Sequence, residues 1–179
     1  MQYSPEQWAD WIEASKRADA EREAERMKDP VYRKLKEGYW EFPDSSQSPG
    51  SANVCVASFL TARGGVVILD WTGERGGTAI AYYGGGIPTT RVMKRMKVSL
   101  TQSGATQTVQ AFHGPFPWAN QIGMVMFAVP STEALLNAME DKQDFEVTVA
   151  GGSWISGAWH SGLAARDKLR QCVQDRKQK

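Results

Sequence analysis

Two cysteines and two histidines are the side chains of this chain best suited to nucleophilic chemistry. Cys55 and Cys172 are its only thiols, and His113 and His160 are its only imidazoles. A thiol enzyme would pair Cys55 with His113, or Cys172 with His160, because the base must reach a thiol whose pKa is depressed. The local sequence suggests neither pair, since the apolar strand around Cys55 disfavours a thiolate. We therefore expect no thiol catalysis.

The same two cysteines are better explained as a structural disulfide. They bracket nearly the whole region that reads as β-strands, and no third thiol competes with them. A bond between Cys55 and Cys172 would indicate a periplasmic or secreted protein, because disulfides persist in oxidising compartments. A cytosolic protein with two free thiols would have the same sequence. No signal peptide precedes the charged N-terminal segment, so an exported protein would begin here at its mature N-terminus, with Met1 added.

Other motifs for catalysis or ligand binding are weak. The widely spaced cysteines and histidines lack the local ligand pairs of a zinc site. The glycines at 84–86 lack the Lys-Ser/Thr ending of a phosphate loop. Asp70 and Glu74 could form a carboxylate pair beside a hairpin turn, although solvated turn carboxylates are the more common case. We expect no metal and no cofactor, and the rival enzyme class is a small hydrolase that uses a thiol or this carboxylate pair.

The overall balance of charge restricts the partners. The 179 residues contain 21 Lys and Arg against 20 Asp and Glu, a net charge of +1. No field of the whole molecule therefore draws it to nucleic acid or to anionic lipid. No apolar run approaches the roughly 20 residues of a membrane span, so we expect a protein that does not span the membrane. The sequence leaves its oligomeric state open.

The distribution of charge predicts an N-terminal helical arm over residues 1–38. This segment holds eight Lys and Arg and nine Asp and Glu. Ser4 is a suitable N-cap, with Pro5 at the first helical position and Gln7 placed to close a capping box. Trp8 and Trp11 lie on one helical face. These tryptophans either pack on the arm's own domain, the commoner fate of such a stripe, or bind a partner.

The rest of the chain predicts a mainly β fold with helices. Residues 39–51 read as a linker and first strand, and alternation of apolar and polar residues begins at 52. Helices are expected near 131–140 and 162–174, the second capped by Ser161 and presenting Cys172 to the core. We expect an α+β fold: one antiparallel β-sandwich over 52–179 with the N-terminal helical arm, and a C-terminal helix closed by the disulfide.

Two surface segments are candidates for partner binding. The first concentrates four cations in seven residues: Arg91, Lys94, Arg95 and Lys97. These could meet phosphate, an acidic glycan or an acidic protein face, although a lysine-rich edge strand that discourages sheet association is the commoner explanation. The second is the aromatic loop at 112–118, where Phe116 and Trp118 are either exposed anchors for protein or peptidoglycan, or side chains that close one end of the sandwich.

The C-terminal part resembles known periplasmic β-sandwich families. The matching segments are Leu135-Leu-Asn-Ala-Met139, Phe145-Glu-Val-Thr-Val149 and Gly162-Leu-Ala-Ala-Arg-Asp-Lys-Leu-Arg-Gln-Cys172. Over residues 122–173 they are similar to the invasion-associated locus B proteins and to accessory proteins of type VI secretion. In those families a helix precedes a strand pair and a closing helix, and the last cysteine commonly bonds back to an early strand. The resemblance implies an envelope-resident binding or assembly factor without a cofactor.

We therefore expect a non-enzymatic factor that binds another protein of the bacterial cell envelope. It would serve a secretion or conjugation apparatus, or act as an immunity or inhibitor protein. The alternatives are the small hydrolase and a cell-wall-binding module that uses the aromatic loop.

Overall fold

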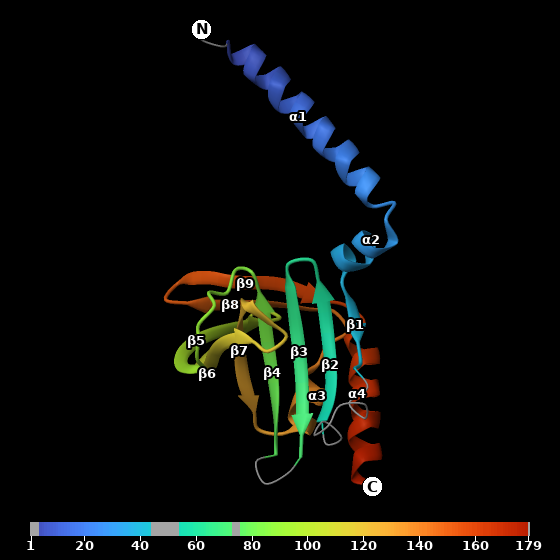
Figure 1. Ribbon diagram of the computed structural model, residues 1–179, viewed down its shortest axis with the longest axis vertical. Coiled ribbons are helices and arrows are strands. Elements are labelled where there is room, and N and C mark those ends of the chain that lie inside the picture. Colours follow the sequence, from blue (N-terminus) through green and yellow to red (C-terminus); the bar gives the residue numbers. More distant parts are fainter. Residues whose placement is uncertain (1–3, 44–53, 73–75, 179) are drawn as a thin grey trace. The chain divides into compact units, whose positions relative to one another are not determined.

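The computed structural model describes residues 4–43, 54–72 and 76–178, and the chain divides into two compact units, 1–37 and 38–179 (Figure 1). The first unit contains α1 (Pro5–Arg26) and α2 (Pro30–Glu37). The described residues of the second unit form nine strands and two helices. They are β1 (Tyr39–Glu41), β2 (Val54–Thr61), β3 (Gly64–Trp71), β4 (Gly77–Gly84), β5 (Lys94–Gln102), β6 (Ala105–Phe116), β7 (Ala119–Val129), α3 (Thr132–Ala138), β8 (Gln143–Val149), β9 (Gly152–Trp159) and α4 (Gly162–Lys177).

Local side-chain caps define the two helices of the arm. The hydroxyl of Ser4 accepts from the backbone N–H of Gln7, and the Gln7 side chain accepts from the Ser4 N–H, which confirms the predicted capping box. Asp29 accepts from the N–H of Val31 at the start of α2. The carboxylate of Glu23 joins the helices, since it accepts from the Tyr32 hydroxyl at 2.9 Å and pairs with Lys36.

The second unit is a single antiparallel sheet in the order β1-β2-β3-β4-β7-β6-β5-β8-β9. The mainly β prediction is confirmed, but a sandwich of two stacked sheets is not. The sheet curls into a half-barrel instead, and its strands enclose the core on one side (Figure 1). Each neighbouring pair of strands is hydrogen-bonded, so the strands form one continuous curled sheet instead of two separate sheets.

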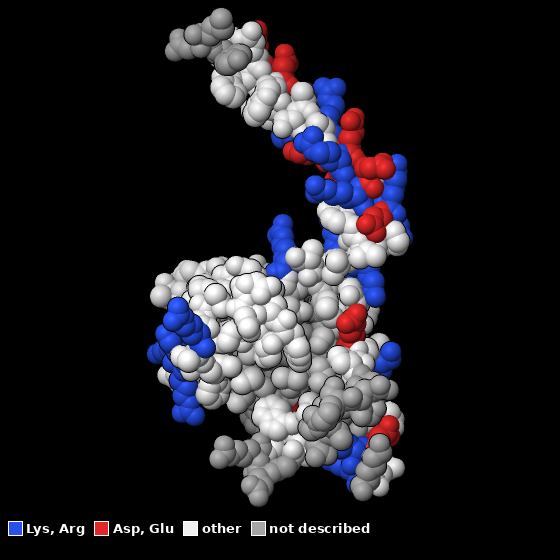
Figure 2. Space-filling view, in the orientation of Figure 1, with Lys and Arg blue, Asp and Glu red and all other residues white. Residues whose placement is uncertain are grey.

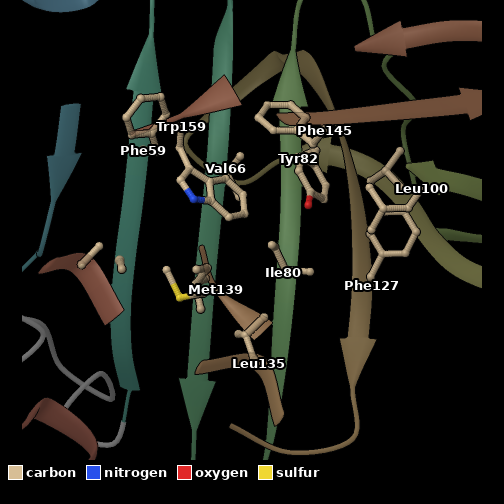
Figure 3. Packing of buried hydrophobic residues seen from close by; sticks show 14 of the residues in the cluster. Phe59, Val66, Ile80, Tyr82, Leu100, Phe127, Leu135, Met139, Phe145 and Trp159 are labelled. Carbon is tan, nitrogen blue, oxygen red and sulfur yellow. The ribbon is translucent and has the colours of Figure 1, made fainter. Parts of the chain in front are cut away.

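The main core fills the inside of this half-barrel. Alternate residues of β2, β3 and β4 point into it, including Phe59, Val66 and Tyr82, and they meet Phe145 and Trp159 from β8 and β9 (Figure 3). The Tyr82 ring lies 4.8 Å from the Phe145 ring, centroid to centroid. Burial raises the pKa of the Tyr82 hydroxyl, which accepts a hydrogen bond from Gln102 at 3.0 Å. The aromatic side chains thus link the early strands to the late ones.

A smaller apolar cluster lies on the other face of the same strands. Val67, Ala81 and Met124 are buried there, although the residues beside them in sequence point into the main core. Strand β7 is therefore covered on both faces: Val125 belongs to the main core and Met124 to the smaller cluster. An uninterrupted apolar run is typical of such a strand.

The predicted cap of α4 is wrong. Ser161 adopts a left-handed conformation with φ of 57°, and its side chain makes no capping hydrogen bond. Asp141, which follows α3 and precedes β8, occupies that role instead. Its backbone carbonyl accepts from the N–H of Gly162 at 2.9 Å, and its carboxylate accepts from the N–H of Leu163 at 3.4 Å. A cap supplied from a distant segment leaves no local signal in the sequence.

Candidate functional site

Cys55 and Cys172 form a disulfide, as predicted. The side chain of Cys55 on β2 points into the main core. Cys172 lies on the face of α4 that presents Leu169 and Val173 to this core. Their Cα atoms are 5.9 Å apart, within the usual range of a disulfide, and 117 residues separate them. In the chain-entropy description, closing so long a loop stabilises the fold by about 4–5 kcal/mol. The bond therefore fastens α4 to the second strand of the sheet.

A buried ion pair fastens the same helix to the next strand. Arg176 of α4 pairs with the carboxylate of Asp70 on β3, and its guanidinium also donates to the Asp70 backbone carbonyl at 2.9 Å. Thr78 of β4 donates to the same carboxylate at 3.1 Å, and Thr132 at the start of α3 donates to it as well. One carboxylate therefore joins β3, β4, α3 and α4. Such a charge needs these partners, because an unpaired buried charge is costly.

The hydrolase hypothesis used Asp70 as one member of a carboxylate pair with Glu74. Glu74 lies outside the described residues. Asp70 itself is buried and held by Arg176 and two threonine hydroxyls, so its carboxylate serves the packing of α3 and α4. Arg176 was not among the candidate residues predicted from the sequence. The available signal was its position one helical turn after Cys172, on the side of α4 that was already expected to face the core.

Both histidines bind backbone carbonyls. Nε2 of His113 donates to the carbonyl of Pro88 at 2.6 Å, and Nε2 of His160 donates to the carbonyl of Gly38 at 3.0 Å. The His160 ring also contacts Phe59 edge to face. In the oxidised protein both sulfurs are in the disulfide. Neither cysteine can then supply the thiolate that a thiol hydrolase requires.

The arm exposes the predicted pair of tryptophans. Trp8 is 51% exposed and Trp11 is 63% exposed, and their rings meet edge to face at 5.8 Å. Ile12 adds a third exposed apolar side chain beside them. No described residue of α1 is buried. Within the first unit, the helix therefore carries a compact apolar patch.

The segment predicted as an aromatic loop is instead the end of β6 and the short turn before β7, and its two candidate residues differ in exposure. Phe116 is only 8% exposed, because its ring stacks on Tyr83 with centroids 4.0 Å apart and planes 8° apart. Trp118 is 70% exposed and meets Phe116 edge to face. Tyr83 itself lies over Gly65, where any Cβ would come within 2.7 Å of the Tyr83 oxygen. The three rings thus form a ladder from the sheet to Trp118 at the surface.

The cationic segment lies on β5 and the loop before it. Lys94, Arg95 and Lys97 are exposed residues of β5, and Arg91 is exposed in the preceding loop. The strand is not at the edge of the sheet, since it pairs with β6 along its length and with β8 from Ser99 to Gln102. The sequence favoured an edge strand. Among the residues that the structure describes, only the first part of β5, Lys94–Val98, lacks a paired strand on the side away from β6.

Within the described residues, no group of three or more His, Cys, Asp or Glu side chains could hold a metal ion. None of the helices in that part of the chain is both long and apolar enough to span a bilayer.

Searches for similar proteins found no match: not among models of protein families, not among curated proteins and not among solved structures.

Proposed function

We propose that the protein is a non-enzymatic binding factor of the bacterial cell envelope, and that its N-terminal helix docks on another envelope protein. Its role would be that of an accessory part of a secretion or conjugation apparatus, or of an immunity factor. The resemblance of its C-terminal part to envelope proteins points the same way. The observation that carries the proposal is the exposed apolar patch of α1, formed by Trp8, Trp11 and Ile12.

The patch has the composition of a binding hot spot. Tryptophan is enriched among the residues that supply most of the energy of protein interfaces, and it loses little conformational entropy when it binds. The opposite face of α1 is highly charged, with surface pairs such as Arg17–Glu13 that contribute little to stability. A helix with one such apolar patch fits a partner's hydrophobic groove, as in other helix-in-groove complexes.

The disulfide supports the location. A long-range bond between Cys55 and Cys172 is compatible with an oxidising compartment, where such bonds persist.

The exposed ring of Trp118, held by Phe116 and Tyr83, favours cell-wall binding as a second candidate function, because a rigid aromatic platform suits stacking on sugar rings.

Site-specific photo-crosslinking tests the docking proposal. A photoreactive residue at Ile12 should crosslink one envelope protein in the producing cells, and the same residue at Glu13 should not. The captured protein is then purified and titrated with the full chain by calorimetry. We expect Trp8→Ala/Trp11→Ala to weaken binding at least 100-fold, consistent with the loss of two hot-spot residues. The control Glu6→Ala/Glu13→Ala, on the charged face, should bind normally. Equal binding by both variants would refute the proposal.

A further inference from the structure

The middle of the chain carries positive charge without any carboxylate. No Asp or Glu occurs between Glu74 and Glu133, whereas Arg91, Lys94, Arg95 and Lys97 all lie in this region. None of the ion pairs among the described residues involves any of these four cations. Figure 2 shows blue side chains gathered over the β5–β6 side of the molecule with no red beside them on this face. The region is thus complementary to an acidic ligand.

The outer face of the β5–β6 hairpin arranges two of these cations in a row. Met96 and Val98 pack toward the main core, so Arg95 and Lys97 point to the opposite face. Arg95 lies over the ring of Phe112, its partner on β6, with 5.2 Å from guanidinium carbon to ring centroid. Further along the hairpin, the hydroxyls of Ser99 and Thr108 bond to each other at 2.6 Å.

Among the described strands, the backbone beside these cations pairs with a neighbouring strand on one side only. The neighbouring strand β8 begins its pairing with β5 only at Ser99. In the part of the chain that the structure describes, Lys94–Val98 pairs with β6 and with no strand on its other side. Ladder bonds alternate in direction along an antiparallel strand, so about half of the backbone groups of this stretch point away from β6. They can receive a short added strand.

We propose that Lys94–Val98 is a docking edge for an extended acidic segment of a partner protein. The segment adds to β5 as a strand through main-chain hydrogen bonds, and alternate carboxylates lie beside Arg95 and Lys97 on the outer face. The inference rests on the proposed function in that it gives the chemistry of a protein partner, but it uses a different surface from α1. A net charge of only +1 favours this local recognition over nucleic acid or anionic lipid, which respond to the field of a whole basic surface.

The probe is a capped nine-residue peptide of alternating Thr and Glu, titrated into the isotopically labelled full chain. We expect the amide signals of Lys94–Val98 to shift and their hydrogen exchange to slow. The variant Arg95→Gln/Lys97→Gln should bind the peptide at least tenfold more weakly. The control Arg63→Gln/Lys142→Gln removes the same charge elsewhere and should change binding less than twofold. The same peptide with N-methylated alternate amides should bind at least fivefold more weakly, because it cannot complete the ladder.

Three results would overturn the proposal: equal weakening by both charge pairs, amide shifts at the outer strand β9 instead of β5, or binding of phosphatidylglycerol vesicles or a single-stranded oligonucleotide without binding of the peptide. Self-association of the Arg95→Gln/Lys97→Gln variant, with peptide affinity unchanged, would show that the cations only keep copies apart. The Trp8→Ala/Trp11→Ala variant should retain peptide binding. The failure of the α1 proposal and the failure of this one are therefore distinguishable.

Discussion

Cys55 and Asp70 lie directly opposite each other on β2 and β3, and both side chains point toward α4. Their partners, Cys172 and Arg176, are one helical turn apart on that helix. A covalent bond and a buried ion pair therefore join the C-terminal half of α4 to adjacent positions of the sheet. We refer to these four residues as the α4 clamp.

Loss of the disulfide should destabilise the second unit without changing its fold. We expect Cys55→Ala/Cys172→Ala to lower the free energy of unfolding by about 2–5 kcal/mol, because the unfolded chain regains the freedom of a long loop. Urea unfolding followed by tryptophan fluorescence measures this difference. The wild-type protein with its disulfide reduced is the matched control and should lose a similar amount. A double variant as stable as the oxidised wild type would contradict this role of the bond.

The ion pair of the α4 clamp should show strong coupling. Arg176→Met leaves the Asp70 carboxylate buried without its cation and should cost about 3–5 kcal/mol. Asp70→Asn should cost a similar amount because it leaves the guanidinium uncompensated. The double variant Asp70→Asn/Arg176→Met should lose much less than the sum of the two single changes. Additive losses in this double-mutant cycle would mean that the two side chains do not interact as the structure has them.

The link between α1 and α2 should weaken in acid. The hydrogen bonds from Lys36 and Tyr32 hold the pKa of Glu23 below its usual range. A carboxyl with a lowered pKa contributes stability above its unfolded-state pKa, and that stability is lost as the pH falls through the folded-state value. A carbon-detected NMR titration should give a Glu23 midpoint below the ordinary glutamate value. Lys36→Gln should raise this midpoint, and an unchanged midpoint would contradict the pairing.

The two residues of the aromatic loop should respond differently to truncation. Phe116→Ala removes the ring stacked on Tyr83 and should cost about 3 kcal/mol, as for other buried phenylalanines. Trp118→Ala removes an exposed ring and should change stability by less than about 0.5 kcal/mol. Thermal unfolding of both variants makes the comparison directly. Equal destabilisation would show that Trp118 is packed rather than exposed.

The sequence predicted those features of the fold that depend on local patterns. Spacing along the chain predicted the Ser4 capping box and the inward face of α4 with Cys172, and both are confirmed. The disulfide followed from the cysteine count, because two thiols allow only one intramolecular pairing.

The remaining features depend on contacts between distant segments. Pairing of β4 with β7 rather than β5 makes one curled sheet where two stacked sheets were expected, and no local signal specifies it. Two further contacts also join segments that are distant in the sequence: Asp141 caps α4, and Arg176 pairs with Asp70. The burial of Phe116 could not be predicted from local spacing either, because its ring stacks on Tyr83, which lies far away in the sequence.

The disulfide closes the scaffold, and our central proposal is that the protein works in an oxidising compartment. The most direct test is to block free thiols with an alkylating reagent in intact producing cells, and then to map the isolated protein by non-reducing mass spectrometry. We predict one linked peptide pair that contains Cys55 and Cys172, with neither cysteine alkylated. Recovery of both cysteines as alkylated free thiols would contradict the claim.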